Sequence, residues 1–276
     1  MRFVGRGRAT LLLIALLAPV AAGCSTRVLQ VVDPDPLPPG LFADLVGYWH
    51  LDDGPGSKTA HDSTERGNDG TLYHLDDAWT AGRAGGALEI NHAGWVGVPR
   101  STSIDAIVHQ VTVSAWVYWE DPITAADIWG TALSRQLGTG INQHYHLSIR
   151  MDGRPSFWLT TAPTPPATKD TVLLVAAPAV APKMTWLHLA GTYDGAQSRL
   201  YVDGELVASS PITGDFHSDT TPVILGGNGN DASGVPTELF PGRIDELMLY
   251  ARALSDAEIA QLHMLFPAGS VDAGRD

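Results

Sequence analysis

Hydrophobic and polar positions divide the chain into three parts. Residues 9–22 form a largely apolar run, residues 33–40 are rich in proline and acids, and residues 41–266 alternate hydrophobic and polar positions in short segments. Alternation with a period of two is typical of β-strands that bury one face. The segment VTVSAWVY at 111–118 is the clearest example. The pattern therefore predicts a β-rich body.

Turn signals separate these segments at short intervals. Two strand-like runs within 199–208 are joined by Asp203 and Gly204, a dipeptide that accepts the positive φ angles of a type I′ turn. Short strands with frequent turns are typical of an antiparallel β-sandwich, so we expect an all-β jelly roll. The other expected strands are 47–51, 87–91, 95–98, 144–150, 156–161, 186–193, 222–225 and 243–250.

One helix is expected, near the C-terminus. Ser255 and Glu258 have the spacing of a capping box, and Ile259, Leu262 and Phe266 follow on one stripe. We expect this helix to pack against one end of the sandwich. The composition does not change within 41–266 and no segment repeats another, so a single domain is the simplest interpretation.

The N-terminal part has the features of an export signal. Arg2, Arg6 and Arg8 precede the apolar run, which is too short to span a bilayer comfortably and ends in small residues. The sequence VAAGC that ends at Cys24 resembles a bacterial lipobox, which would make residues 1–23 a lipoprotein signal peptide and Cys24 a lipidated N-terminus. The alternative is an ordinary signal peptide cut after Ala22 or Gly23, which leaves a free thiol.

The segments on either side of the body are expected to be extended. Residues 24–40 include DPDPLPPG, which reads as a polyproline linker, and residues 267–276 read as a frayed tail. With a lipid at its start, the chain would be held at the bacterial outer membrane, on the periplasmic side or the cell surface, by the lipid alone.

Composition narrows the possible partners. The 276 residues include 17 Lys and Arg against 30 Asp and Glu, which gives a formal net charge of −13. This balance argues against nucleic acid, since phosphate binding needs a basic surface. A single cysteine provides neither an intrachain disulfide nor a Cys-x-x-Cys metal site.

Seven short segments with distinctive motifs lie along the body. They are VGYWHLDDG at 46–54, DSTERGNDGT at 62–71, GGAL at 85–88, TVSAWV at 112–117, WLHLAGTYDG at 186–195, LYVDG at 200–204 and RIDELMLY at 243–250. In their types and their order these segments resemble the laminin-G-like, concanavalin A-like jelly-roll family of bacterial surface and secreted proteins. The resemblance implies the jelly-roll fold and leaves function open, because the fold hosts lectins, adhesins and enzymes.

The acidic loop at 62–70 is the best candidate for a metal site. Ca²⁺ prefers six to eight oxygen ligands, and Asp62 and Asn68 can supply them together with main-chain carbonyls. The resemblance implies that Asp245 of the last strand meets this loop and completes a structural Ca²⁺ site, to which Asp52 or Asp53 could add an oxygen. The alternative is a loop held without metal by its own Asx-turn hydrogen bonds.

Aromatic residues are the candidates for ligand binding. Trp49, Trp116 and Trp186 lie inside strand motifs and are expected in the core. Flat aromatic side chains near strand ends can stack on the apolar faces of sugar rings, while carboxylates and amides bind the hydroxyl groups. The residues with this expected role are Trp95, Trp119, Trp129, Tyr145 and Trp158.

Catalytic patterns are absent from the sequence. The paired acids that glycosidases of this fold carry on one strand face are not found, nor is a nucleophile elbow, a zinc-protease motif or a P-loop. His144 and His146 share a strand face, but no third metal ligand is apparent beside them. We therefore expect a non-catalytic module that binds a glycan or glycoconjugate. An adhesive envelope protein that binds another protein is the alternative, and a polysaccharide-degrading enzyme is a weaker one.

Overall fold

The structure is a computed structural model. It describes residues 37–120, 129–136, 143–163, 168–217, 221–229 and 235–267. Cys24 and residues 268–276 therefore lie outside the described residues. Leu37 and the residues after it form one compact unit, which is the body described below.

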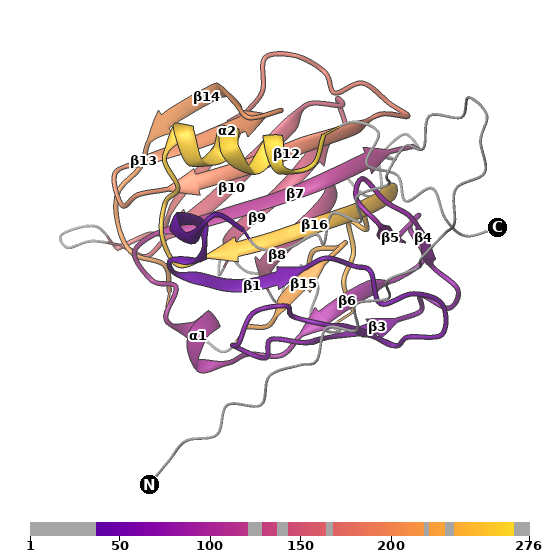
Figure 1. The fold of residues 1–276 in the computed structure, drawn as a ribbon. Helices are drawn as coiled ribbons and strands as arrows, with labels where there is room; N and C mark the ends of the chain where they lie inside the picture. The colour runs from indigo at the N-terminus through magenta and orange to yellow at the C-terminus, as the bar shows by residue number, and fades with distance from the viewer. Residues whose placement is uncertain are drawn as a thin grey trace, which may run out of the picture. The chain divides into compact units, whose positions relative to one another are not determined.

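Two antiparallel sheets build this body, as the sequence predicts (Figure 1). Sheet A has the strand order β14-β13-β12-β7-β16-β5-β4, and β1 also pairs with β16. Its strands are β1 (Leu45–Trp49), β4 (Trp79–Ala81), β5 (Gly86–Glu89), β7 (Val111–Trp119), β12 (Trp186–Tyr193), β13 (Gln197–Val202), β14 (Glu205–Pro211) and β16 (Gly242–Tyr250).

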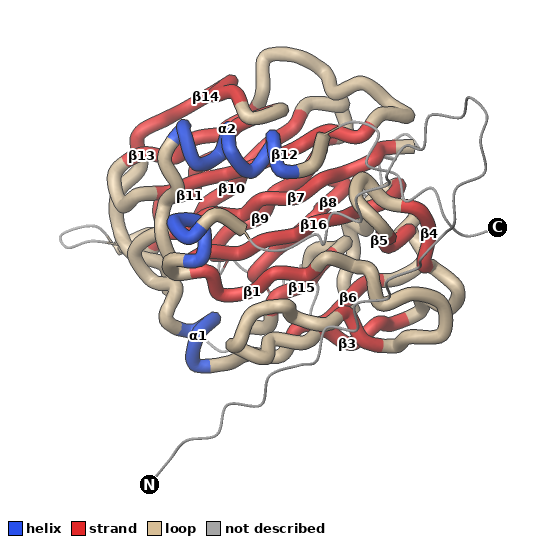
Figure 2. The backbone as a smooth tube through the Cα atoms, in the orientation of Figure 1, coloured by secondary structure: helices blue, strands red, loops and turns tan. Residues whose placement is uncertain are grey.

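Sheet B lies behind sheet A in Figure 1 and has the order β11-β10-β9-β8-β15-β6-β3-β2. Its strands are β2 (Thr59–Ala60), β3 (Gly70–Tyr73), β6 (Trp95–Val98), β8 (Trp129–Gln136), β9 (Gln143–Arg150), β10 (Pro155–Thr161), β11 (Thr171–Ala176) and β15 (Val223–Leu225). Three short helical segments complete the described elements (Figure 2): the 3-10 helix η1 (Pro39–Phe42), α1 (Thr102–Asp105) and α2 (Asp256–Leu265).

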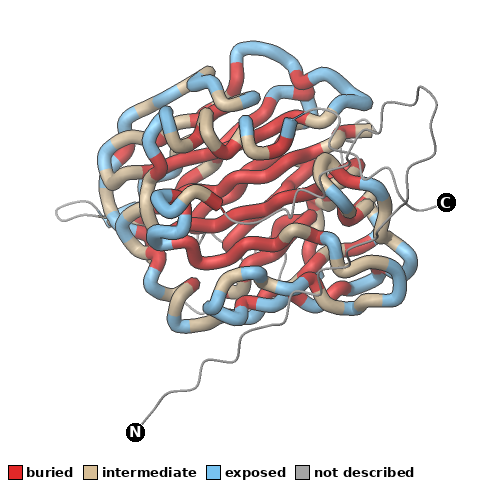
Figure 3. Tube along the Cα trace, viewed as in Figure 1, coloured by how far each residue is buried: buried red, intermediate tan, exposed pale blue. Residues whose placement is uncertain are grey.

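The main hydrophobic core fills the space between the two sheets (Figure 3). Alternate residues of each strand point into it, for example Leu147 of β9, Phe157 of β10 and Leu189 of β12, all with no exposed surface. Gly191 of β12 has no side chain where the Phe157 ring packs, and a Cβ atom there would lie 2.3 Å from the ring. The close approach of β12 and β10 therefore depends on a glycine at this position.

A second core lies on the other side of sheet A. Helix α2 covers this face with the predicted stripe of Ile259, Leu262 and Phe266, which packs with Trp116 and Tyr201 of the sheet. Leu37 and Leu41 are buried in the same cluster, so the body includes the last residues of the proline-rich segment.

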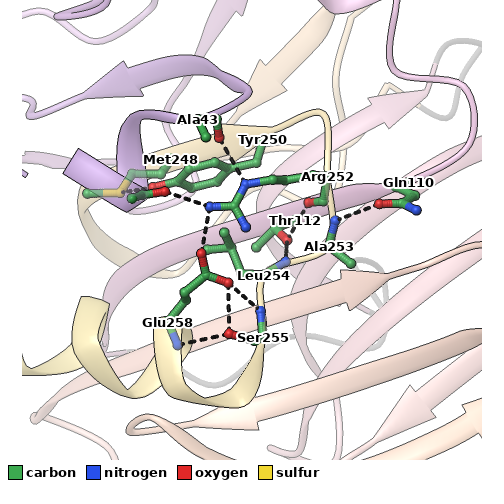
Figure 4. A network of polar contacts seen from close by, with 11 residues as sticks. Ala43, Gln110, Thr112, Met248, Tyr250, Arg252, Ala253, Leu254, Ser255 and Glu258 are labelled. Carbon is green, nitrogen blue, oxygen red and sulfur yellow. Dashed lines mark hydrogen bonds and ion pairs between the residues drawn. The ribbon is translucent and has the colours of Figure 1, made fainter. Parts of the chain in front are cut away.

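Helix α2 is held in place by the predicted capping box and by an arginine (Figure 4). The Ser255 hydroxyl accepts from the Glu258 backbone N–H, and the Glu258 side chain accepts from the Ser255 backbone. Arg252 donates to Glu258 at 2.7 Å and to the carbonyls of Gly40 at 2.9 Å and Ala43 at 3.0 Å. This contact links the two ends of the body.

Candidate functional site on sheet B

The face of sheet B that points away from sheet A, here called the outer face, carries polar and aromatic side chains. In β8, β9 and β10, Leu133, Leu147 and Phe157 point into the core, whereas Ser134, His146 and Trp158 lie on this face. One row of strand partners crosses nearly the whole sheet. It consists of Thr71, Gly97, Ile224, Ser134, His146, Trp158 and Leu174.

Trp129, His146 and Trp158 form an aromatic cluster on the outer face. The two indoles meet edge to face, with ring centroids 5.8 Å apart, and the imidazole lies 5.4 Å from one and 5.6 Å from the other. Both tryptophans are half-buried, so part of each ring is accessible. The Arg150 guanidinium lies 5.7 Å from the Trp129 ring, and its charge is balanced by Asp152 at 3.5 Å.

Buried polar groups adjoin this cluster. Burial lowers the pKa of His146 to about 3, so the ring is neutral at pH 7. Its Nδ1 atom lies 3.4 Å from Nδ2 of Asn228, and the same amide nitrogen donates to Glu238 at 2.7 Å. The backbone N–H of Thr131 donates to the carbonyl of Glu238 at 3.1 Å, which joins the strand to the loop that carries the acid.

A second aromatic group lies farther along the same sheet. Tyr73 of β3 and Trp95 of β6 are strand partners whose rings stack at 5.3 Å with an angle of 15° between them. Tyr73 is 45% exposed. Beside them is a shallow depression of about 300 Å³ lined by the residues His74, Leu75, Asp76, Asp77, Ala78, Glu89, Ile90, Asn91 and Ala93. The pair offers an open ring surface next to carboxylates.

Two of the five aromatic residues predicted to bind ligand are instead part of the core. Tyr145 is 1% exposed and packs against Phe216 at 5.5 Å, and Trp119 is 5% exposed under Lys183. A sugar cannot reach either ring, so the expectation for these residues is wrong. Tyr145 points to the core face of β9, and Trp119 ends a strand whose burial continues to its last residue. Trp95, Trp129 and Trp158 keep accessible surface.

Asp62 holds its loop through hydrogen bonds to protein groups. Its Oδ1 atom accepts from the backbone N–H groups of Tyr48 and Thr64, each at 3.0 Å. Its Oδ2 atom accepts from the Thr64 hydroxyl at 2.7 Å and the Asn68 backbone at 2.8 Å. This geometry is that of the Asx-turn alternative.

The other two predicted ligands from the N-terminal part of the body also have protein partners. The Asn68 side chain is buried and donates to the Val46 carbonyl at 2.7 Å and to Ser103 at 3.0 Å. Asp53 contacts the imidazole of His61. The structure thus brings Asp62 and Asn68 into one loop, with Asp53 paired beside it.

Asp245 belongs to a different group of residues. It is fully buried in β16, where it accepts from the backbone N–H groups of Arg83 at 2.6 Å, Ala84 at 3.1 Å and Glu246 at 2.8 Å. Burial raises the pKa of Asp245 well above its usual value, and the neighbouring Glu246 carboxylate raises it further. Tyr48 connects this group to the loop, since its backbone bonds Asp62 and its hydroxyl bonds Glu246.

Within the described ranges no three His, Cys, Asp or Glu side chains are placed to hold a metal ion together. The calcium site therefore stays a prediction. The carboxylates of Asp62 and Asp245 accept hydrogen bonds from two separate sets of protein donors.

Another surface depression, of about 580 Å³, lies beside the start of α2 on sheet A rather than at the aromatic residues. It is open and shallow, and its polar residues bond one another: Arg199 pairs with Asp194 at 2.6 Å, and Tyr201 donates to Asp256 at 2.7 Å. Its polar groups are thus already paired with one another, so we place the candidate site on sheet B, where Trp129, Trp158 and Tyr73 keep accessible ring surface.

The sequence profile of one family matches residues 92–260. This family, Laminin_G_3, is described as the concanavalin A-like lectin/glucanases superfamily. The chain belongs to this superfamily. Its observed sandwich, with the C-terminal helix against one sheet, is thus a concanavalin A-like fold. A search of curated proteins found no match.

Solved structures with the same fold cover 80% of this chain. Domain 4 of AbnA, an extracellular arabinanase from Geobacillus stearothermophilus solved with arabinotriose, is 22% identical with a TM-score of 0.56 over 98% of that domain. The receptor binding domain of a botulinum neurotoxin C/D mosaic serotype is 16% identical, with a TM-score of 0.57 over 51% of its chain. A mutant Trypanosoma rangeli sialidase is 20% identical, with a TM-score of 0.55 over 33% of its chain.

Three residues of this concanavalin A-like face escaped the sequence analysis: Tyr73, Asn228 and Glu238. Tyr73 follows the acidic loop so closely that it was not assigned to a strand, although Thr71, Leu72 and Tyr73 continue the alternation of β3. Asn228 and Glu238 lie in the loop after β15, and only long-range contacts bring them to His146. No periodicity in that loop marks them.

Proposed function

We propose that this chain is a non-catalytic module that binds carbohydrate on the outer face of sheet B. The observation that carries the proposal is the pair of half-buried tryptophans, Trp129 and Trp158, which lie edge to face beside buried polar groups. Sugar rings need this combination, since their C–H faces stack on aromatic rings and their hydroxyls need hydrogen-bond partners.

The face is broad and shallow, which bears on affinity. The Tyr73–Trp95 pair lies on β3 and β6 of the same sheet as the tryptophan cluster, and only β15 separates β6 from β8 in the strand order. Contacts spread over such a surface favour a chain of sugars rather than a single ring. Small contact areas of this kind correspond to dissociation constants on the order of 0.1–1 mM per site.

The family and its structural relatives are compatible with this proposal. The arabinanase domain was solved with arabinotriose, and the neurotoxin domain is described as receptor binding. Binding of another envelope protein is the alternative, and the experiment below separates the two.

The test is retention of the purified chain by immobilised polysaccharides. We expect the wild type to be retarded by at least one polysaccharide and W129A and W158A to lose this retardation. W186A is the matched control, because Trp186 is also half-buried but lies in β12 of sheet A. Retention that is equal in all four proteins would contradict the proposed face. New reducing ends or unsaturated products in the incubated polysaccharide would indicate catalysis instead.

We also propose that the chain is exported and anchored through a lipid on Cys24, at the bacterial outer membrane or cell surface. The basis is the sequence around Cys24, and no helix in the described part of the chain is long and apolar enough to cross a membrane. Expression with labelled palmitate tests the anchor: the wild type should incorporate label and move to the membrane fraction, and C24A should do neither. Equal fractionation of both would contradict it.

A further inference from the structure

The loop between β11 and β12 exposes apolar side chains at one end of the sandwich. Residues 177–184 read APAVAPKM, so Lys183 is the only polar side chain among them. Val180 is 58% exposed and Met184 is 61% exposed, and both prolines of the segment are exposed as well. Among the large hydrophobic side chains in the described part of the chain, only Met264 is more exposed than Met184. Exposed apolar groups of this kind mark places where a protein meets a membrane or a partner.

Hydrogen bonds from the body hold this loop in place. The backbone N–H of Ala181, a residue only 6% exposed, donates to the Gly153 carbonyl at 2.8 Å. The backbone N–H of Met184 donates to the Trp119 carbonyl at 2.9 Å. Met184 has a φ of 58°, which is uncommon for a residue with a long side chain, and strained conformations cluster at functional sites. The exposure of the loop's apolar side chains is therefore fixed by the fold.

The turn between β9 and β10 adds a third apolar side chain at the same end. Met151 is 55% exposed and lies in this turn, two residues before Gly153. A Cβ atom at Gly153 would lie 2.7 Å from Val180 and 2.9 Å from the ring of Trp119, so this glycine lets the turn and the loop meet. The three exposed side chains of Met151, Val180 and Met184 are called the apolar tip below.

A lysine without an acid partner lies beside the apolar tip. The Lys183 ammonium is 4.8 Å from the centre of the Trp119 ring, and the side chain is exposed. No acid in the described segments forms an ion pair with it, in contrast to Lys58, which pairs with Asp76. Apolar side chains next to a lysine whose stem covers an aromatic ring are a combination that membrane interfaces favour.

We propose that the apolar tip docks on the surface of a phospholipid bilayer, with its side chains among the acyl chains and Lys183 at the lipid phosphates. Apart from the lysine, the side chains of the tip and of residues 177–184 have no hydrogen-bond donor or acceptor. A glycan would therefore leave its hydroxyl groups unpaired there, and the exposed prolines have no N–H to pair with a partner's strand. A bilayer needs neither, because its acyl chains take up apolar side chains and its phosphates attract a cation.

The length of chain before the body allows this orientation when Cys24 carries a lipid, and only this step rests on the proposed anchor. Arg252, two residues after β16, bonds the Gly40 carbonyl at 2.9 Å, whereas Trp119 pairs with the first residue of β16. The anchored start of the body and the apolar tip thus lie at opposite ends of this strand, which spans about 30 Å. Residues 24–36 can reach about 45 Å when fully extended. The tip and the lipid can therefore engage the same membrane.

The experiment places a fluorescent reporter on the apolar tip. Cys24 is the only cysteine, so residues 25–276 with V180C take a single label whose emission rises in hydrocarbon. This chain contains the whole compact unit, and an N-terminal His tag holds it on vesicles of phosphatidylethanolamine and phosphatidylglycerol that carry a nickel-chelating lipid. We expect the emission of the label at 180 to rise several-fold on the vesicles. Adding M184D should abolish this rise, because it places a carboxylate in the tip.

Val172 provides the matched control. It is also a valine and is 44% exposed, but it lies near the start of β11, away from the loop, so a label at V172C should not respond. No rise at 180, or equal rises at 180 and 172, overturns the proposal. A rise without vesicles that grows with protein concentration would show that a second copy covers the tip, and this also overturns it. Polysaccharide retention of M184D should equal that of the wild type, so a failure of membrane docking leaves the proposed carbohydrate binding standing.

Discussion

Tyr73 and Trp95 are cross-strand partners whose rings stack at 5.3 Å on neighbouring strands of sheet B. Gly97, two residues after Trp95, leaves room for the Tyr73 ring, since a Cβ atom there would lie 3.1 Å from it. The pair extends the aromatic surface of the sheet beyond the strands that carry Trp129 and Trp158. A long glycan could therefore contact both groups at once.

This arrangement predicts a dependence on ligand length. Tyr73→Ala should weaken the binding of long oligosaccharides several-fold and leave that of short ones unchanged, because only long chains reach both aromatic groups. Phe42→Ala is the matched control: Phe42 is 47% exposed, close to the 45% of Tyr73, but belongs to η1. Titration calorimetry with a size series checks this. Equal losses at all lengths would show that Tyr73 belongs to one compact site.

Histidine burial predicts that acid destabilises the fold. His146 and His188 have pKa values lowered to about 3 by burial, against about 6.5 in the unfolded chain. The unfolded chain therefore binds more protons between these values, and stability falls as the pH drops through this window. Each histidine should cost about 1.4 kcal/mol per pH unit there.

The measurement is the free energy of unfolding in urea between pH 7 and pH 4.5 for the wild type and H188Q. Glutamine can still contact Ser114, which lies 2.9 Å from Nε2 of His188. Asp245 and Glu246 have the opposite effect on the pH dependence of stability. Burial raises their pKa values, so the folded chain takes up their protons at a higher pH than the unfolded chain does. The difference between the two proteins isolates the histidine. Identical pH slopes would show that His188 does not titrate as described.

The contacts of Arg252 predict that replacing this residue destabilises the fold. Its hydrogen bond to Glu258 lowers the pKa of that carboxyl to about 2, so this stabilisation is present at neutral pH and lost as the pH falls toward 2. Arg252→Met should destabilise the fold by about 1–2 kcal/mol, because it removes charged hydrogen bonds to the helix cap and to η1. Lys58→Met removes a solvent-exposed ion pair and should destabilise the fold much less than Arg252→Met. Equal losses of stability for the two variants in denaturation curves would contradict this prediction.

Asp62 predicts a structural role that does not need metal. Asp62→Ala leaves four donors without their acceptor and should cost about 2–4 kcal/mol, whereas Glu65→Ala in the same loop should stay within about 0.5 kcal/mol. Thermal unfolding of both variants checks this, and a stable Asp62→Ala protein would contradict it.

The calcium prediction can be tested in the same thermal unfolding assay. A midpoint raised by millimolar Ca²⁺ and lost with chelator would support it, and an unchanged midpoint would oppose it.

The local features of the fold could be read from the sequence. β6 and β12 have the expected bounds, and Asp203 and Gly204 adopt the positive φ angles of 49° and 81° that their turn requires. The capping box at Ser255 is also confirmed. These features depend on residues close together in the chain, whose types encode the backbone conformation directly.

Features set by long-range packing were harder to predict. Trp186 was expected in the core but is half-buried at the start of β12, where alternation turns it away from the sandwich interior. Strand β8 was missed, because a bulge between Thr131 and Leu133 interrupts its alternation. Trp129 and Trp158 were found as candidates, but their contact with Asn228 and Glu238 through His146 follows only from the folded chain.

Hydrogen–deuterium exchange with and without a saturating bound polysaccharide tests the central claim most directly. If the outer face of sheet B is the binding surface, exchange should slow in peptides from 129–136 and 143–161, which contain β8, β9 and β10. Peptides from 253–258 and from β13 in sheet A should exchange at the same rate in both samples. Protection confined to those peptides, with none in β8 to β10, would contradict the account.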